Sequence, residues 1–152
     1  MGWRELIRSL ALRWKWEEAH RALEQARKTL SEPGWGGNLK RRVEAARQMS
    51  RMPLPQDIAE HAGQKLVRSR VAALLGGWAV ARLHLEGLEE AHANASSFWV
   101  TLGQLELEER EYERAIGVME RAALAKPEEA AMWKAQIQKL QAAAAAEAAS
   151  ER

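Results

Sequence analysis

Residues 96–129 of the chain read SSFWVTLGQLELEEREYERAIGVMERAALAKPEE. Trp99 and Leu102 are three residues apart and therefore lie on one face of a first helix. The adjacent Gly103 has no side chain, so a second helix can approach the first closely. Ala115 is the small residue expected where the two helices cross. The stretch therefore predicts two helices packed against each other as a hairpin.

These positions give the stretch a resemblance to the tetratricopeptide repeat family. The family pattern is Trp-x2-Leu-Gly, then Ala-x3-large apolar residue, then Pro, over about 34 residues. The chain matches it at Trp99, Leu102, Gly103, Ala115, Met119, Ala122 and Pro127, but has Glu106 where an aromatic residue is usual. The resemblance implies an all-α fold, namely a short right-handed solenoid of about three helical hairpins. A helical array without this ancestry is the structural alternative.

The same phase continues on both sides of this stretch. One repeat length separates Trp78 from Tyr112, and the same interval separates Trp99 from Trp133. The sequence separation between Trp16 and Trp78 exceeds one repeat by most of a second repeat length. This excess indicates an insertion. The expected organisation is a first hairpin over 1–33, an inserted loop and basic helix over 34–55, a second, degenerate hairpin over 56–95, the best-matching hairpin over 96–129, and a capping helix with an Ala-rich tail over 130–152.

Some parts of this organisation have weaker signals. The first helix of the second hairpin lacks the family's Trp, Leu and Gly, which are replaced by Lys65, Arg68 and Ser69. Its register is therefore left open. In the insert, Asn38 is expected to cap the basic helix, and Pro55 to lie in the first turn of the next helix. The Ala-rich tail, 142–149, offers little apolar surface and is expected to add little to the packing.

Composition narrows the class of protein further. A chain of 152 residues is about one domain long, and no apolar run in it is long enough to cross a bilayer. The lack of Cys excludes disulfides, thiolate metal sites and a cysteine nucleophile. We expect a cytoplasmic location, with an anchor upstream of this sequence left open. Residues 99–116 are also faintly similar to the C-terminal repeats of HemY-type membrane proteins of tetrapyrrole metabolism, whose membrane-spanning N-terminus has no counterpart here.

No pattern of catalytic or metal-binding residues occurs in the sequence. The four histidines include no pair at i and i+4 that flanks a glutamate, as a zinc hydrolase needs. The Gly-rich stretch 34–37 follows no strand and precedes no Lys-Ser/Thr, so it is not a phosphate loop. The clustered glutamates are expected to be solvated, and they are Glu106, Glu108, Glu109, Glu111 and Glu113. We therefore predict a protein that is not an enzyme and needs no cofactor or metal.

The resemblance instead implies a protein–protein interaction scaffold or adaptor, because first helices of such hairpins line a concave groove that binds a peptide or helix. Exposed positions on these helices nominate Arg4, Arg8, Arg70 and Gln104, with Lys65 as a further candidate. These cations favour an acidic partner segment, or else simply solubilise the surface. Trp35, in the Gly-rich loop, is either a binding anchor or packs locally over the hairpin. The family's carboxylate clamp is not expected, since the predicted first helices carry no Asn.

Nucleic-acid binding is the alternative function. The net charge of +2 is unevenly distributed, with +6 up to Met52, −1 over 53–95 and −3 from Ser96 onward. Five cations on the basic helix 39–51 are candidate phosphate contacts, namely Lys40, Arg41, Arg42, Arg47 and Arg51. Trp35 beside them could stack on a base. Glu44 interrupts this patch, however, and the whole chain is nearly neutral, so protein binding is the favoured hypothesis.

Overall fold

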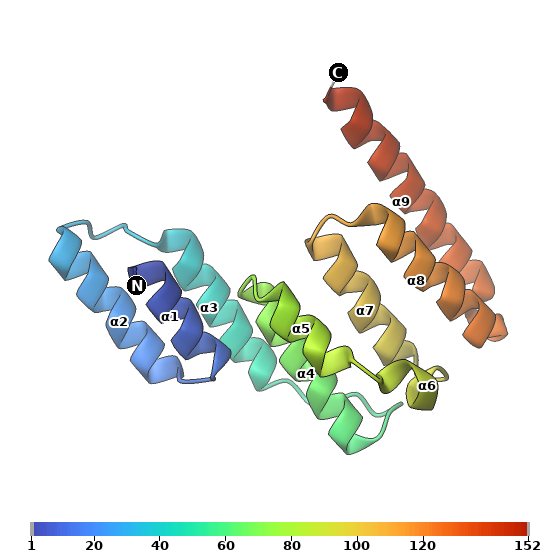
Figure 1. Ribbon diagram of the computed structural model, residues 1–152, viewed down its shortest axis with the longest axis horizontal. Helices are drawn as coiled ribbons and strands as arrows, with labels where there is room; N and C mark the ends of the chain where they lie inside the picture. Colours follow the sequence, from blue (N-terminus) through green and yellow to red (C-terminus); the bar gives the residue numbers. More distant parts are fainter. Residues whose placement is uncertain (1, 152) are drawn as a thin grey trace. The chain divides into compact units, whose positions relative to one another are not determined.

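In the computed structural model, which describes residues 2–151, all regular secondary structure is helical (Figure 1). The predicted all-α class is therefore confirmed, as expected for a chain rich in Ala, Leu, Glu and Arg. In chain order the helices are α1 (Trp3–Leu12), α2 (Trp16–Leu30), α3 (Gly37–Ser50), α4 (Glu60–Leu74), α5 (Trp78–Leu85), α6 (Leu88–His92), α7 (Ser96–Glu108), α8 (Tyr112–Ala125), the 3-10 turn η1 (Pro127–Glu129) and α9 (Ala130–Ser150).

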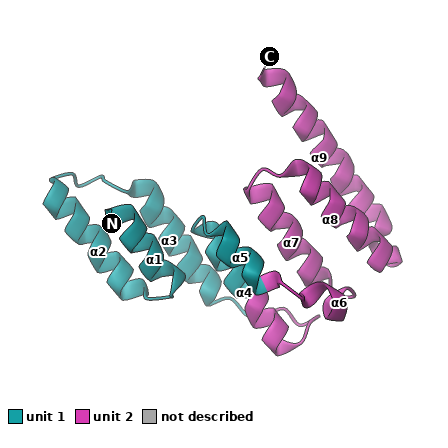
Figure 2. Cartoon of the chain, viewed as in Figure 1, with its two compact units in different colours: residues 1–54, 67–84 teal, residues 55–66, 85–152 magenta. Residues whose placement is uncertain are grey.

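The described chain divides into two compact units (Figure 2). Unit 1 takes in the chain up to Leu54 together with Val67–His84. Unit 2 takes in Pro55–Leu66 together with the chain from Leu85 onward. Unit 1 therefore contains α1, α2 and α3, and unit 2 contains α6 to α9, while α4 contributes residues to each.

The core of unit 1 forms where α1 packs on both α2 and α3. Each of these helices is amphipathic, and it turns one stripe of apolar residues at helical spacing toward the core. The stripe residues are Ile7, Leu10 and Ala11 of α1, Ala19 and Leu23 of α2, Leu39, Val43 and Ala46 of α3, and Val67 and Val71 of α4. The helix expected as an insert is thus a full member of this core.

Two of the expected helix starts are wrong. α3 begins at Gly37 with Gly36 as its N-cap, and Asn38 lies in the first turn, where its side chain accepts a hydrogen bond from Arg41. Gly36 takes this position because its φ of 71° is left-handed, a conformation that glycine adopts without a steric cost. Pro55 lies in a loop, and α4 begins only at Glu60.

The loop before α4 has a structural role of its own in unit 2. Asp57 accepts a hydrogen bond from the backbone N–H of Ser97, at 2.9 Å. This N–H belongs to the first turn of α7 and has no partner within the helix. Burial alone would raise the pKa of Asp57, but the hydrogen bonds from Ser97 outweigh it, and the pKa is lowered. The loop therefore supplies a cap to a helix 40 residues further along the chain.

The core of unit 2 forms where α8 packs on both α7 and α9. The buried residues from these helices are Phe98, Trp99 and Leu105 of α7, Ala115, Val118, Met119 and Ala122 of α8, and Trp133 and Leu140 of α9. The indole Nε1 of Trp99 donates to the carbonyl of Ala93 at 2.7 Å. The hydroxyl of Ser96 donates to the carboxylate of Glu129 at 2.7 Å, which ties the start of α7 to η1.

The Ala-rich end of α9 makes polar contacts with the start of α8. Glu147 lies 3.7 Å from Arg110, which is in the turn before α8. Glu147 also forms a hydrogen bond with Tyr112, the first residue of α8. The hydrogen bond with Glu147 raises the pKa of Tyr112. Ala144, one turn earlier on α9, is half-buried. The tail therefore makes polar contacts at the surface of unit 2, beside the small apolar contribution that we expected of it.

Four helix ends share one backbone pattern. One of them ends α2, where Ser31 has a φ of 54° and the N–H of Glu32 bonds to the carbonyl of Arg27 at 3.0 Å. The other three lie in the short turns between α1 and α2, α4 and α5, and α7 and α8. Each places a single residue in the left-handed conformation, namely Trp14 at φ 60°, Gly76 at φ 77° and Arg110 at φ 60°. The N–H of the following residue then bonds to the carbonyl five residues back, in the pairs Lys15 to Leu10 at 2.9 Å, Gly77 to Ala72 at 2.8 Å and Glu111 to Glu106 at 2.8 Å. A bond of this span is typical of the Schellman motif that ends helices. The three turns therefore end their first helices in the same way.

The turns also align the helices around them. Five residues after each left-handed residue comes an alanine with no exposed surface, and these are Ala19, Ala81 and Ala115. Seven residues before it comes a buried position, occupied by Ile7, Ser69 and Gly103. The register of the degenerate α4, which the sequence left open, is therefore set by Gly76. A side chain added at Gly103 would come within 3.9 Å of Met119, so the two helices are in contact at this point.

The turn pattern predicts opposite effects for two Gly-to-Ala changes. Gly76→Ala places a β-carbon on a left-handed residue and should destabilise the fold by about 1 kcal/mol. Gly34 has an ordinary φ and open space around it, so Gly34→Ala should stabilise by about 0.5 kcal/mol because it restricts the unfolded chain. Urea unfolding followed by circular dichroism measures both. Equal shifts in the same direction would contradict the assigned turn.

Candidate functional site

Two of the nominated arginines lie together on one side of α1. Arg4 and Arg8 are exposed and one helical turn apart, so both project into solvent from the same side of the helix. The guanidinium of Arg4 stacks over the ring of Trp35 at 5.0 Å. Within residues 2–151, Arg8 forms no ion pair. Its charge is therefore available to a partner.

Trp35 is held in place by the elements of unit 1. Its ring is half-buried and packs against the core of that unit. Its carbonyl accepts a hydrogen bond from Nε of Arg27 at 2.9 Å. With Arg4 on its ring, Trp35 is a packed component of the hairpin that also positions an exposed cation. The sequence separately nominated Arg4 and Trp35, but not the contact between them, which joins α1 to the loop between α2 and α3.

The remaining nominated groove residues are distributed between the units. Arg70 is half-buried on the part of α4 that belongs to unit 1. Gln104 belongs to unit 2 and lines a groove between α7 and α9, while Lys65 is exposed on the part of α4 in unit 2. Unit 1 therefore holds Arg4, Arg8 and Arg70, and unit 2 holds Lys65 and Gln104.

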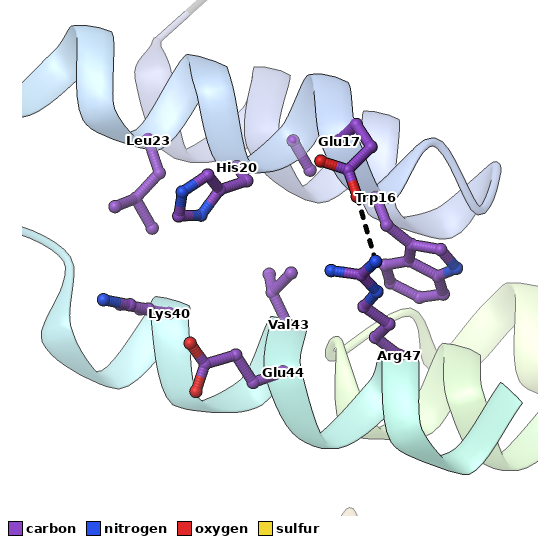
Figure 3. A pocket seen from close by; sticks show the side chains of 9 residues that line it. Trp16, Glu17, His20, Leu23, Lys40, Val43, Glu44 and Arg47 are labelled. Carbon is purple, nitrogen blue, oxygen red and sulfur yellow. Dashed lines mark hydrogen bonds and ion pairs between the residues drawn. The ribbon is translucent and has the colours of Figure 1, made fainter. Parts of the chain in front are cut away.

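A pocket of about 270 Å³ lies between α2 and α3 (Figure 3). Its apolar floor includes Leu23 and Val43, and charged side chains surround it. Arg47 donates to Glu17 across one end, with 2.9 Å between Nη2 and Oε1. The other charged residues of its rim are Lys40 and Glu44. Because two cations and two carboxylates balance, this pocket has no single-sign charge that would select an anion.

The five cations of the proposed nucleic-acid patch do not share one face of α3. Helix geometry of about 100° per residue puts Lys40, Arg47 and Arg51 on the side toward α2, with Arg41 and Arg42 turned about 100° and 200° away. Arg47 is paired with Glu17, and Arg41 with Asn38. A phosphate backbone following one side of α3 would therefore meet only part of this set.

Among the clustered glutamates, Glu106 contradicts the expectation of solvent exposure. Its side chain is only 5% exposed. The reason is its position four residues before the left-handed Arg110. Leu10 and Ala72 are buried at the same position before the left-handed residues Trp14 and Gly76. The sequence carried a signal for this burial, because Glu106 stands where an aromatic residue is usual in the repeat pattern.

Two histidines lie close together in space although they are far apart in the sequence. His61 and His92, which come from α4 and α6, place their rings 5.8 Å apart within unit 2. Within residues 2–151, no three side chains of the metal-binding types gather at one place.

Comparison with models of known protein families, with curated proteins and with solved structures finds no match for this chain. None of the helices described in residues 2–151 combines the length and the apolarity that crossing a bilayer requires.

Proposed function

We propose that the chain is a non-catalytic scaffold of the tetratricopeptide type, which binds an acidic segment of another protein in the cytoplasm. The observation that carries this proposal is the repeated turn. Three helix–turn–helix segments end their first helix with the same hydrogen-bond pattern and place a fully buried alanine at the same position of the second helix. A unit repeated in this way, around Trp14, Gly76 and Arg110, is typical of proteins that present extended binding surfaces.

The exposed cations of unit 1 support an acidic partner. Arg4 and Arg8 lie on one side of α1, and the stacking on Trp35 restricts the guanidinium of Arg4 before any partner arrives. A side chain already held in one place loses less conformational entropy on binding, so its contacts contribute more to affinity. Arg70 adds a third cation in the same unit.

Charge reversal tests this proposal even while the partner is unidentified. The full chain is used to select from a random-sequence peptide library, and the bound pool is sequenced. We expect enrichment of Asp and Glu that declines as salt rises, because exposed charges are screened over about 10 Å at 0.1 M. Arg8→Glu with Arg70→Glu should weaken binding of selected peptides about tenfold, since each reversal turns an attraction into a repulsion.

The matched control is Lys40→Glu with Arg42→Glu on α3, which changes the net charge equally. This variant should keep the selected peptides within about twofold of the parent's affinity. A labelled single-stranded oligonucleotide is titrated in parallel. Two results together would overturn the proposal in favour of nucleic-acid binding. The parent would bind the oligonucleotide and the α3 variant would not, and the library would show no enrichment of acidic peptides. Thermal melts check that Arg70→Glu leaves the fold intact.

A further inference from the structure

The pocket between α2 and α3 keeps one cation and one carboxylate that are not paired within the protein (Figure 3). Arg47 and Glu17 pair with each other, with 2.9 Å between Nη2 and Oε1. The side chains of Lys40 and Glu44 also line the pocket, and within residues 2–151 they form no hydrogen bond or ion pair. The two charges that remain for a ligand are therefore of opposite sign.

These two groups are neighbours on α3. Lys40 is half-buried and Glu44 is exposed, and they are four residues apart. Side chains at this spacing share one face of a helix, with about 5–6 Å between their β-carbons. A lysine that precedes a glutamate is the less favourable order for an ion pair on a helix. A ligand that carries both charges close together can therefore contact both groups without breaking an existing ion pair.

The floor of the pocket is apolar. Ala19 and Leu23 of α2 and Val43 of α3 line it, and all three are buried. The pocket's volume of about 270 Å³ lies just below the range of about 300–1,000 Å³ that is typical of small-molecule sites. It therefore suits a small molecule that has one short apolar group beside its two charges.

We infer that this pocket binds a free α-amino acid with an apolar side chain. The α-carboxylate contacts Lys40 and the α-ammonium contacts Glu44. The apolar side chain lies over Leu23 and Val43. A residue inside a polypeptide lacks both charges, because its amino and carboxyl groups form peptide bonds, and a simple carboxylate or amine carries only one of them. The inference goes beyond the proposed function and uses none of the arginines of α1 and α4.

The NMR signals of the His20 ring in the full chain report on this pocket, because His20 lines it. His20→Gln identifies these signals among those of the four histidines. The probes are leucine, 4-methylpentanoate, which is leucine without the ammonium, and 3-methylbutylamine, which is leucine without the carboxylate. At constant pH we expect leucine to move the His20 signals saturably. Each analogue loses one charged contact and should bind about fivefold more weakly.

Two variants connect this preference to the two unpaired groups. Glu44→Gln should remove the advantage of leucine over 4-methylpentanoate, and Lys40→Gln should remove its advantage over 3-methylbutylamine. The matched controls are Glu18→Gln and Arg42→Gln, at exposed positions that do not line the pocket, and they should keep both advantages.

Three results would overturn the inference. Leucine would move no His20 signal, or either analogue would bind the parent as tightly as leucine, or Glu44→Gln would keep the preference for leucine over 4-methylpentanoate. Acidic-peptide selection through Arg8 and Arg70 depends on other side chains, so the proposed function can fail or stand separately.

Discussion

Replacing Ala115 by glutamate should unfold unit 2 under conditions in which the parent is stable. Ala115 has no exposed surface. A larger side chain there overpacks the interface at about 1–3 kcal/mol, and an unpaired carboxylate in the same place adds several kcal/mol more. Urea unfolding by circular dichroism should show the helical signal of unit 2 lost at a much lower midpoint.

Leu124→Glu is the matched control, because Leu124 lies on the same helix and is 81% exposed. It should change the stability by no more than about 0.5 kcal/mol. An Ala115→Glu variant as stable as this control would show that the alanine does not lie at a helix crossing. The register of the hairpin would then be wrong.

Deleting the chain from Glu128 onward should have a comparable effect, since it removes α9 entirely. Trp133 and Leu140 are buried on unit 2, and truncating a buried Trp alone typically costs about 3–5 kcal/mol. The exposed faces of α7 and α8 should then drive aggregation, measured by light scattering during expression and refolding. A truncated chain that stays monomeric and keeps its melting temperature would remove the capping role of α9.

Two shorter deletions separate packing from the polar contacts of the tail. Deleting 148–152 leaves Glu147 in place and should be neutral. Deleting 143–152 removes the contacts of Glu147 with Arg110 and Tyr112 and should lower the melting temperature slightly, by far less than loss of the whole helix. The comparison of the two deletions tests the expectation that the Ala-rich tail adds little to the packing.

The sequence predicted the helices well because their signals are local. The apolar spacing and the small or helix-breaking residues of 96–129 predict a hairpin, and α7, α8 and the turn at Pro127 lie within that stretch. The sequence likewise predicted a basic helix after the Gly-rich loop, where α3 lies. That α3 joins the core of unit 1 was not predictable, because its pairing with α1 depends on residues far apart in sequence.

The candidate site was less accessible to sequence reasoning for the same reason. The contact of Arg4 with Trp35 and the cap that Asp57 supplies to Ser97 both join distant positions. The left-handed Arg110 was hidden as well, because non-glycine residues rarely adopt this conformation and carry no sequence signal for it. The burial of Glu106 was missed although its position carried a signal, because an aromatic residue is usual there in the repeat pattern.

The packing of several helices mainly on their neighbours in the chain has a consequence for how quickly the protein reaches its native state. α2 packs on α1, α8 on α7, and α9 on α8, so most contacts close short loops. The entropy lost in closing such loops is small and is repaid as soon as a hairpin forms. Chains with this contact pattern fold in about microseconds to milliseconds. Each hairpin can therefore form while later parts of the chain are still being synthesised.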